Sequence, residues 1–191
     1  MSACLKLAIT QIGDLLLHNR ITRDKDGKAL SDIDLVIPNY QRPYKWTAKN
    51  AIQLLDDITE AKNENKETYR VGTLILYLNE ESKYEIVDGQ QRTITFSLLL
   101  RTLGAKNIRF LKQPLANNPY NMRNIPNNYR TLERRVNNIA DDRDRIELRH
   151  YIENNCELIV VITEDLSEAF QFFDSQNARV LNDKKDCHRN K

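Results

Sequence analysis

The sequence predicts an α+β fold in which a small mixed sheet with helices is followed by a mostly helical part. Two segments rich in β-branched and aromatic residues, Tyr69 to Leu78 and Tyr84 to Val87, predict adjacent strands joined by a polar turn. The apolar run Thr93 to Leu103 predicts a buried helix, with Gly104 at the expected stop. The charged stretch Tyr129 to Asn154 predicts further helix.

Shorter elements are expected ahead of these strands. Lys6 to His18 carries apolar residues that favour a short helix, and the charged stretch Thr22 to Asp34 favours a surface loop. Leu35 to Ile37 predicts a short strand that Pro38 ends, because proline cannot donate to a sheet ladder. From Thr47, which can cap a helix, apolar residues recur on one side and predict a helix.

The C-terminal part is expected to add helices and one strand. Asn107 to Asn128 is rich in asparagine and proline and is interpreted as a loop. Leu158 to Ile162 predicts a strand, and Leu166 to Ser175 predicts a helix with Phe170 and Phe173 on one side.

The composition fits one domain. The chain has 191 residues, of which 40% are hydrophobic, enough for one sizeable core. No repeat or low-complexity linker divides it. We therefore expect a core over residues 1–105, a mostly helical extension of the same domain over 106–179, and a disordered, atypical tail over 180–191.

Several classes of protein are disfavoured. No stretch approaches the roughly 18 apolar residues of a membrane span, and the first residues lack a secretory signal, so we expect a cytoplasmic protein without a membrane partner. The net charge of +2 gives little general attraction to nucleic acid. The spacing of the cysteines and histidines along the sequence does not match that of metal ligands; they are Cys4, Cys156, Cys187, His18, His150 and His188.

The segment Asp88-Gly89-Gln90-Gln91-Arg92 carries the clearest chemical signal. It places a glycine turn, an arginine and then the hydroxyl of Thr93 at the start of a helix, where unpaired N–H groups and the helix dipole favour a phosphate. Arg92 could bind phosphate oxygens, and Asp88 could hold Mg²⁺ or orient a water. The alternative is a tight turn in which Asp88 caps the helix and Arg92 is solvated.

A second segment, Ile37 to Trp46, concentrates tyrosines, cations and the sole tryptophan. Tyr44 or Trp46 could stack on a base while Arg42 and Lys45 contact phosphates, as a nucleotide or a single-stranded nucleic acid would require. The alternative is that the aromatic residues are core anchors beside a proline-stiffened loop.

Together, Tyr40-Gln41-Arg42-Pro43-Tyr44-Lys45-Trp46 and Ile86 to Thr93 resemble the N-terminal domain of the GmrSD family, also called domain of unknown function 262. The resemblance covers most of Leu7 to Arg179 and implies a fold similar to ParB and sulfiredoxin. It also implies binding and hydrolysis of a nucleoside triphosphate with Mg²⁺ held at Asp88. The catalytic residues implied are Asp88, Gln91 and Arg92. The implied nucleotide-binding residues are Gln41, Arg42, Tyr44, Trp46, Gly89, Gln90, Thr93 and Asn177.

The family resemblance further implies a regulatory domain of a modification-dependent DNA restriction system for phage defence. Nothing in the chain resembles the HNH nuclease half that full-length members carry, so we expect a separately encoded HNH-type partner and no DNA cleavage by this chain alone. The stretch Val180 to Lys191 departs from the family pattern and is interpreted as a truncated or frameshifted end.

A non-catalytic, ParB-like module that binds DNA or a partner protein is the alternative function. The sequence has no GxxxxGK[ST] motif, so hydrolysis rests on the resemblance alone. The arginines between Arg130 and Arg149 alternate with acidic residues, which is typical of a solvated helix with ion pairs, and a DNA-backbone face is the competing interpretation.

Overall fold

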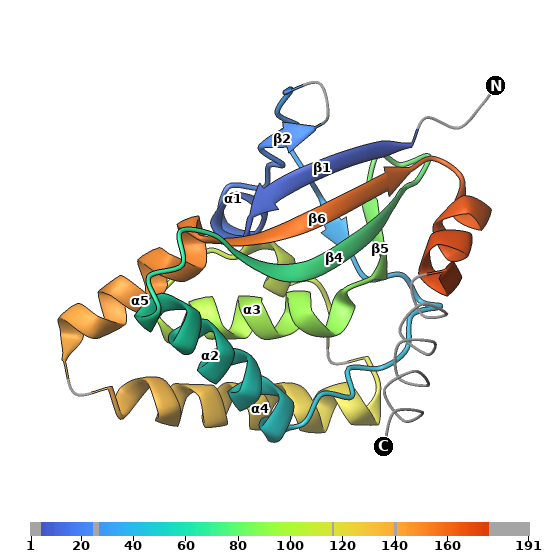
Figure 1. Cartoon of the computed structure of the whole chain (residues 1–191). Helices are drawn as coiled ribbons and strands as arrows, with labels where there is room; N and C mark the ends of the chain where they lie inside the picture. Colours follow the sequence, from blue (N-terminus) through green and yellow to red (C-terminus); the bar gives the residue numbers. More distant parts are fainter. Residues whose placement is uncertain (1–4, 25–26, 116, 140, 176–191) are drawn as a thin grey trace, which may run out of the picture.

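The computed structural model describes residues 5–24, 27–115, 117–139 and 141–175 (Figure 1). Over these residues the strands form one mixed six-stranded sheet in the order β2-β1-β6-β4-β5-β3. β6 pairs in parallel with β4 and antiparallel with β1, so a strand from the C-terminal part lies in the middle of the sheet. The strands are β1 (Lys6–Gln11), β2 (Arg23–Asp24), β3 (Leu35–Val36), β4 (Tyr69–Leu78), β5 (Tyr84–Asp88) and β6 (Cys156–Thr163).

The helices gather mainly on one face of this sheet. α3 runs beneath the strands, with α2 and α4 beyond it (Figure 1). Their bounds are α1 (Ile12–Leu17), α2 (Ala48–Asn63), α3 (Gln90–Thr102), α4 (Pro119–Asn137) and α5 (Asp142–Asn154), with a 3-10 helix, η1 (Arg109–Lys112), and a helix over residues 166–175. Within the described ranges, no helix is both long and apolar enough to cross a membrane.

The α+β class and the central elements are confirmed. β4 has the predicted bounds, β5 ends one residue later than predicted, and α3 begins at Gln90 and so includes part of the glycine-containing motif. Nine of the thirteen residues of α3 are buried, because the helix lies between the sheet and α4 (Figure 1). The buried residues include the polar Thr93, Thr95 and Ser97, and each of these hydroxyls donates to the carbonyl oxygen four residues earlier in the chain.

The predicted helix over Lys6 to His18 is wrong in its first half. Lys6–Gln11 forms β1, in which Ala8 and Thr10 are buried while Leu7 is exposed, and helix begins only at Ile12. The reason is pairing: β1 aligns with β6 over all six of its residues, and these ladder hydrogen bonds outweigh a weak local helical pattern.

The loop predicted over Asn107 to Asn128 is also wrong. η1 lies within it, and α4 begins at Pro119, at the position where proline fits the first turn of a helix. The Asn118 side chain accepts a hydrogen bond from the Asn121 N–H and caps this end. Asparagine is a poor helix former, so tertiary contacts must offset its low propensity here.

The opposite face of the sheet is partly covered by the helix over residues 166–175. Its Ala169 is fully buried and joins Ile75, Val87 and Val161 in a small second core, with Phe173 packed against it. This confirms the predicted helix with an apolar side. The second core places the helix beside the end of β5, where the glycine-containing motif begins.

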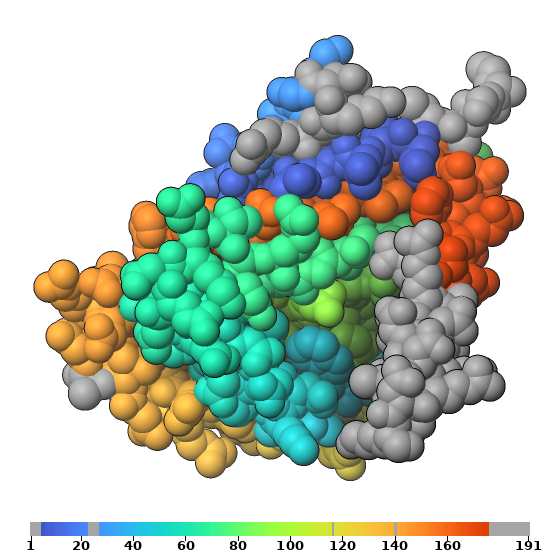
Figure 2. All heavy atoms as spheres, in the orientation of Figure 1, coloured from blue at the N-terminus to red at the C-terminus, as the bar shows by residue number. Residues whose placement is uncertain are grey.

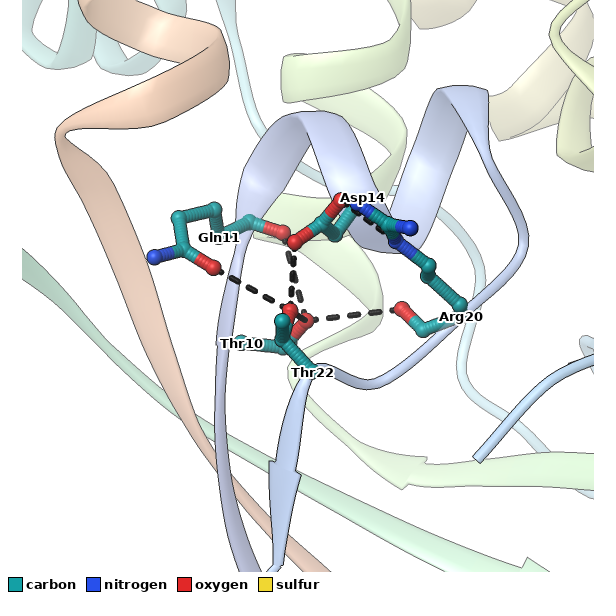
Figure 3. A network of polar contacts seen from close by, with 5 residues as sticks. All are labelled: Thr10, Gln11, Asp14, Arg20 and Thr22. Carbon is teal, nitrogen blue, oxygen red and sulfur yellow. Dashed lines mark hydrogen bonds and ion pairs between the residues drawn. The ribbon is translucent and has the colours of Figure 1, made fainter. Parts of the chain in front are cut away.

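A polar network fixes the corner between β1, α1 and β2 (Figure 3). The Asp14 carboxylate accepts hydrogen bonds from the Thr22 hydroxyl and from Nε of Arg20, the latter at 2.7 Å. The Thr10 hydroxyl reaches the Arg20 carbonyl oxygen at 3.4 Å. Residues 12–22 therefore turn back on β1 at a position away from the glycine-containing motif.

Candidate functional site

A cavity of about 380 Å³ lies where α3 begins. In Figure 2, light-green atoms of α3 lie in a recess between β4 and the segment that precedes α2. The segment before α2, the end of β5, the start of α3 and the helix over residues 166–175 supply its walls. The lining residues are Tyr40, Gln41, Arg42, Trp46, Val87, Asp88, Gly89, Gln90, Gln91, Arg92, Phe170 and Phe173.

The start of α3 offers free N–H groups to this cavity. Gly89, the residue before the helix, adopts φ 95° and ψ 0°, and no described side chain caps this helix end. A Cβ at this position would lie 2.9 Å from Leu74 Cδ1 and 3.1 Å from the Thr73 carbonyl oxygen, so only glycine fits. The first N–H groups of a helix lack intrahelical acceptors and carry partial positive charge, which suits an anion.

Arg92 adds a full positive charge beside the helix start. Its guanidinium lies against Gly72 of β4, where φ is +134° and a Cβ would lie 2.8 Å from Cζ of Arg92. Burial lowers the pKa of Arg92, and the Asp88 carboxylate opposes this shift. The Arg92 side chain forms no hydrogen bond or ion pair with any of the described residues, so its charge is available to a ligand.

The alternative of a capped turn with a solvated arginine is not what the structure contains. Gly89 occupies the cap position and the Asp88 carboxylate does not cap α3. Arg92 is partly buried against β4 instead of extending into solvent. Asp88, the last residue of β5, lines the cavity together with Arg92.

Two glutamine side chains tie the segment before α2 to the end of β5 and the start of α3. Nε2 of Gln41 donates to the Val87 carbonyl oxygen at 2.6 Å, and Nε2 of Gln90 donates to the Arg42 carbonyl oxygen at 3.0 Å. Gln90 is buried, and its Oε1 has no partner among the described residues. These amides hold Arg42 at the cavity.

Gln91 extends the same tie along the segment. Its Nε2 donates to the Pro43 carbonyl oxygen at 3.1 Å, and its Oε1 accepts from the N–H groups of Lys45 at 2.7 Å and Trp46 at 3.1 Å. The amide of Gln91 is therefore occupied with backbone groups, which is the geometry of a positioning residue.

Three asparagines of α4 hold the segment from the other side. Oδ1 of Asn121 accepts from the Tyr44 N–H at 2.6 Å, and Nδ2 of Asn124 donates to the Tyr44 carbonyl oxygen at 2.9 Å. Nδ2 of Asn128 donates to the Tyr44 hydroxyl and to the Trp46 carbonyl oxygen, both at 2.8 Å. The buried backbone of this segment thus finds partners without forming a helix or strand.

Two predicted nucleotide-binding residues lie in the core instead of at the cavity. Tyr44 is fully buried and its hydroxyl shares a 2.8 Å hydrogen bond with Thr95 of α3. Thr93 is buried and its hydroxyl donates to the Gly89 carbonyl oxygen at 3.0 Å. Trp46 lines the cavity while also packing against the core. Asn177 lies outside the described residues.

Several lining residues were absent from the sequence-based site. Tyr40, Val87, Phe170 and Phe173 all face the cavity. The spacing of Phe170 and Phe173 predicted a shared helix side, but only the tertiary fold places that side at the start of α3. Tyr40 stands within the aromatic segment, so its neighbours were the available signal.

The cavity lining has too few carboxylates to hold a metal ion alone, so a metal ion would bind there only together with a ligand that supplies further oxygen atoms. No cluster of three or more His, Cys, Asp or Glu side chains able to bind a metal occurs in the part of the chain that the structure describes. Asp88 is the carboxylate among the lining residues. Mg²⁺ is often bound by one or two carboxylates together with substrate phosphates, and Asp88 meets that requirement.

Fold and site together define the class: a small α+β domain that presents an uncapped helix start and an arginine to a cavity. Residues 23–182 match the family described as GmrSD restriction endonuclease, N-terminal domain. The chain belongs to this family and is a component of a restriction system, a form of phage defence, with a nuclease domain as the implied partner. No match to a curated protein was found.

Replacement of Gly72 tests whether its missing side chain makes room for Arg92. We expect Gly72→Ala to lower the free energy of unfolding by roughly 1–3 kcal/mol, through strain at positive φ and the clash with the guanidinium. In an Arg92→Ala background the clash disappears and only the strain remains. Urea unfolding of the four proteins in this cycle measures the coupling. Equal penalties in both backgrounds would show that the two residues do not interact.

Proposed function

We propose that this domain binds a nucleoside triphosphate with its phosphates at the start of α3. The observation that carries the proposal is the partly buried Arg92 guanidinium, which has no hydrogen bond or ion pair among the described residues and lies beside the uncapped helix end. Arg42, an exposed cation at the same cavity, supplies a second positive charge. A triphosphate brings the negative charges that these groups need.

We further propose that the bound nucleotide is hydrolysed. In this reaction a water oxygen attacks the terminal phosphorus, the bond to the bridging oxygen breaks, and a nucleoside diphosphate and inorganic phosphate result. Asp88 would hold Mg²⁺ or orient the water, and Arg92 would offset the charge that develops on the transferred group. Mg²⁺, when bound, would neutralise phosphate charge. Gln91, by holding residues 43–46, would keep the site assembled.

The proposed role in restriction is regulatory. Binding or hydrolysis of the nucleotide would control a nuclease, of the HNH type, that acts on modified DNA. The support is family membership together with the cavity, because the family is that of a restriction endonuclease N-terminal domain.

Calorimetric titration with each of the four nucleoside triphosphates tests the binding proposal. A charge-assisted hydrogen bond contributes about 1.5–3 kcal/mol, so Arg92→Ala should weaken binding by roughly 10- to 150-fold. Arg109→Ala is the matched control, since this arginine pairs with Asp34 at 3.2 Å, away from the cavity. The proposal fails if the wild-type chain binds none of the four, or if Arg92→Ala binds as tightly as wild type. Phosphate release, with and without DNA, then measures turnover.

A second candidate function, binding of a nucleic-acid backbone, is favoured by the charges on α4. The α5 arginines are paired as the sequence predicted, with Arg143 on Glu147 and Arg149 on Glu153. On α4, Arg135 pairs with Asp56. The exposed α4 arginines without an acidic partner in the described ranges are Arg123, Arg130 and Arg134. Their spacing of seven and four residues puts them on one side of the helix.

The salt dependence of duplex DNA binding tests this candidate. Each phosphate contact contributes about 0.9 to the slope of log K against log salt, so glutamine at the three α4 arginines should reduce the slope by up to about 2.7. Arg143→Gln, on α5, should leave the slope unchanged because its charge is paired with Glu147. An equal slope for wild type and the triple variant would rule out α4 as the DNA contact.

A further inference from the structure

Two large aromatic side chains are exposed at the cavity and belong to neither hydrophobic core. Tyr40 and Phe170 keep 46% and 40% of their surface accessible, yet both line the cavity that Arg42 and Arg92 also line. Their ring centroids lie 5.9 Å apart at an interplanar angle of 59°. Apolar rings beside cations in a concave site are typical of a place where a ligand completes the packing.

Tyr40 is held in position from its far end. Its hydroxyl donates to Oε2 of Glu85 at 2.9 Å, and Oε1 of the same carboxylate accepts from Nδ2 of Asn79 at 2.9 Å. Burial and the Glu85 carboxylate raise the pKa of Tyr40 above its ordinary value, so the hydroxyl remains a donor near neutral pH. A ring fixed in this way loses little conformational entropy when a ligand packs on it.

Phe170 is presented by the helix over residues 166–175. The preceding residue, Ala169, is fully buried in the second core. The same core contains Val87, the residue of β5 that directly precedes Asp88. The same strand therefore anchors the helix that carries Phe170 and leads into the segment that carries Arg92. The aromatic pair and the helix start are fixed relative to each other through β5.

We infer that Tyr40 and Phe170 form a stacking wall for the base of the nucleotide. The inference rests on the proposed function, in which the phosphates lie at Gly89 to Arg92. A nucleotide needs an apolar flat surface for its base at one end and positive charge at the other, and this cavity contains both. Because the Tyr40 hydroxyl is engaged with Glu85, the wall offers ring surface and no group that reads a base edge. It accepts any of the four bases.

Comparison of ATP with inorganic tripolyphosphate, titrated calorimetrically into the full chain, tests the inference. Loss of an aromatic side chain on which a base stacks lowers binding affinity roughly 5- to 150-fold. Phe170→Ala should therefore lower the affinity for ATP by that factor and leave the affinity for tripolyphosphate unchanged. Phe170→Leu, which keeps an apolar side chain in the helix, should also weaken ATP selectively and serves if the alanine variant is unstable. Tyr120→Ala is the matched control, because this ring is 51% exposed and contacts Lys45 away from the cavity lining.

The outcomes separate the two proposals. If wild type binds neither compound, the phosphate site is wrong and the stacking wall fails with it. If wild type binds both equally, or if the Phe170 variants weaken ATP and tripolyphosphate by the same factor, the stacking wall is overturned while the phosphate site stands. Selective loss of ATP in both Phe170 variants, with Tyr120→Ala unchanged, supports the wall.

Discussion

The amide hydrogen bonds between residues 41–46 and their surroundings are the constraint on which the site depends. This segment has no regular secondary structure, and yet it contains the fully buried Tyr44. Buried backbone groups that lack a ladder or helix must find other partners. The side chains of Gln90 and Gln91 supply them at one side, and those of Asn121, Asn124 and Asn128 supply them at the other. Gln41, within the segment, donates in turn to the Val87 carbonyl oxygen of β5. Without these bonds, the cavity would lose a wall.

The same constraint divides the motif residues into two kinds. The side-chain amides of Gln90 and Gln91 donate hydrogen bonds to the backbone of the segment, so these residues position the ligand site. Asp88 and Arg92 make no such bonds within the described part and line the cavity with their charges. Gly72 and Gly89 make this arrangement possible, since a side chain at either would collide with Arg92 or with β4. Motif membership therefore does not by itself define chemical function.

The central elements could be predicted from sequence because their signals were local. β4 is rich in β-branched and aromatic residues, and α3 contains Ile94, Phe96 and the run Leu98 to Leu100. β1 and α4 could not, because pairing with β6 and contacts to Tyr44 decided their structures. The asparagine spacing of 121, 124 and 128 was a helical signal, but low propensity concealed it. The position of Phe170 at the cavity could not be predicted either, because it depends on where the helix over residues 166–175 packs, and no local sequence pattern indicates that.

In the proposed site, the N–H groups at the start of α3 and the Arg92 side chain bind a phosphate together. The decisive measurement follows the backbone amide resonances of the isotope-labelled chain during titration with inorganic tripolyphosphate. We expect the largest shifts at Gly89 to Arg92, because a bound phosphate accepts hydrogen bonds from these groups. Largest shifts along the outer side of α4, or no shifts at the start of α3, would contradict the claim.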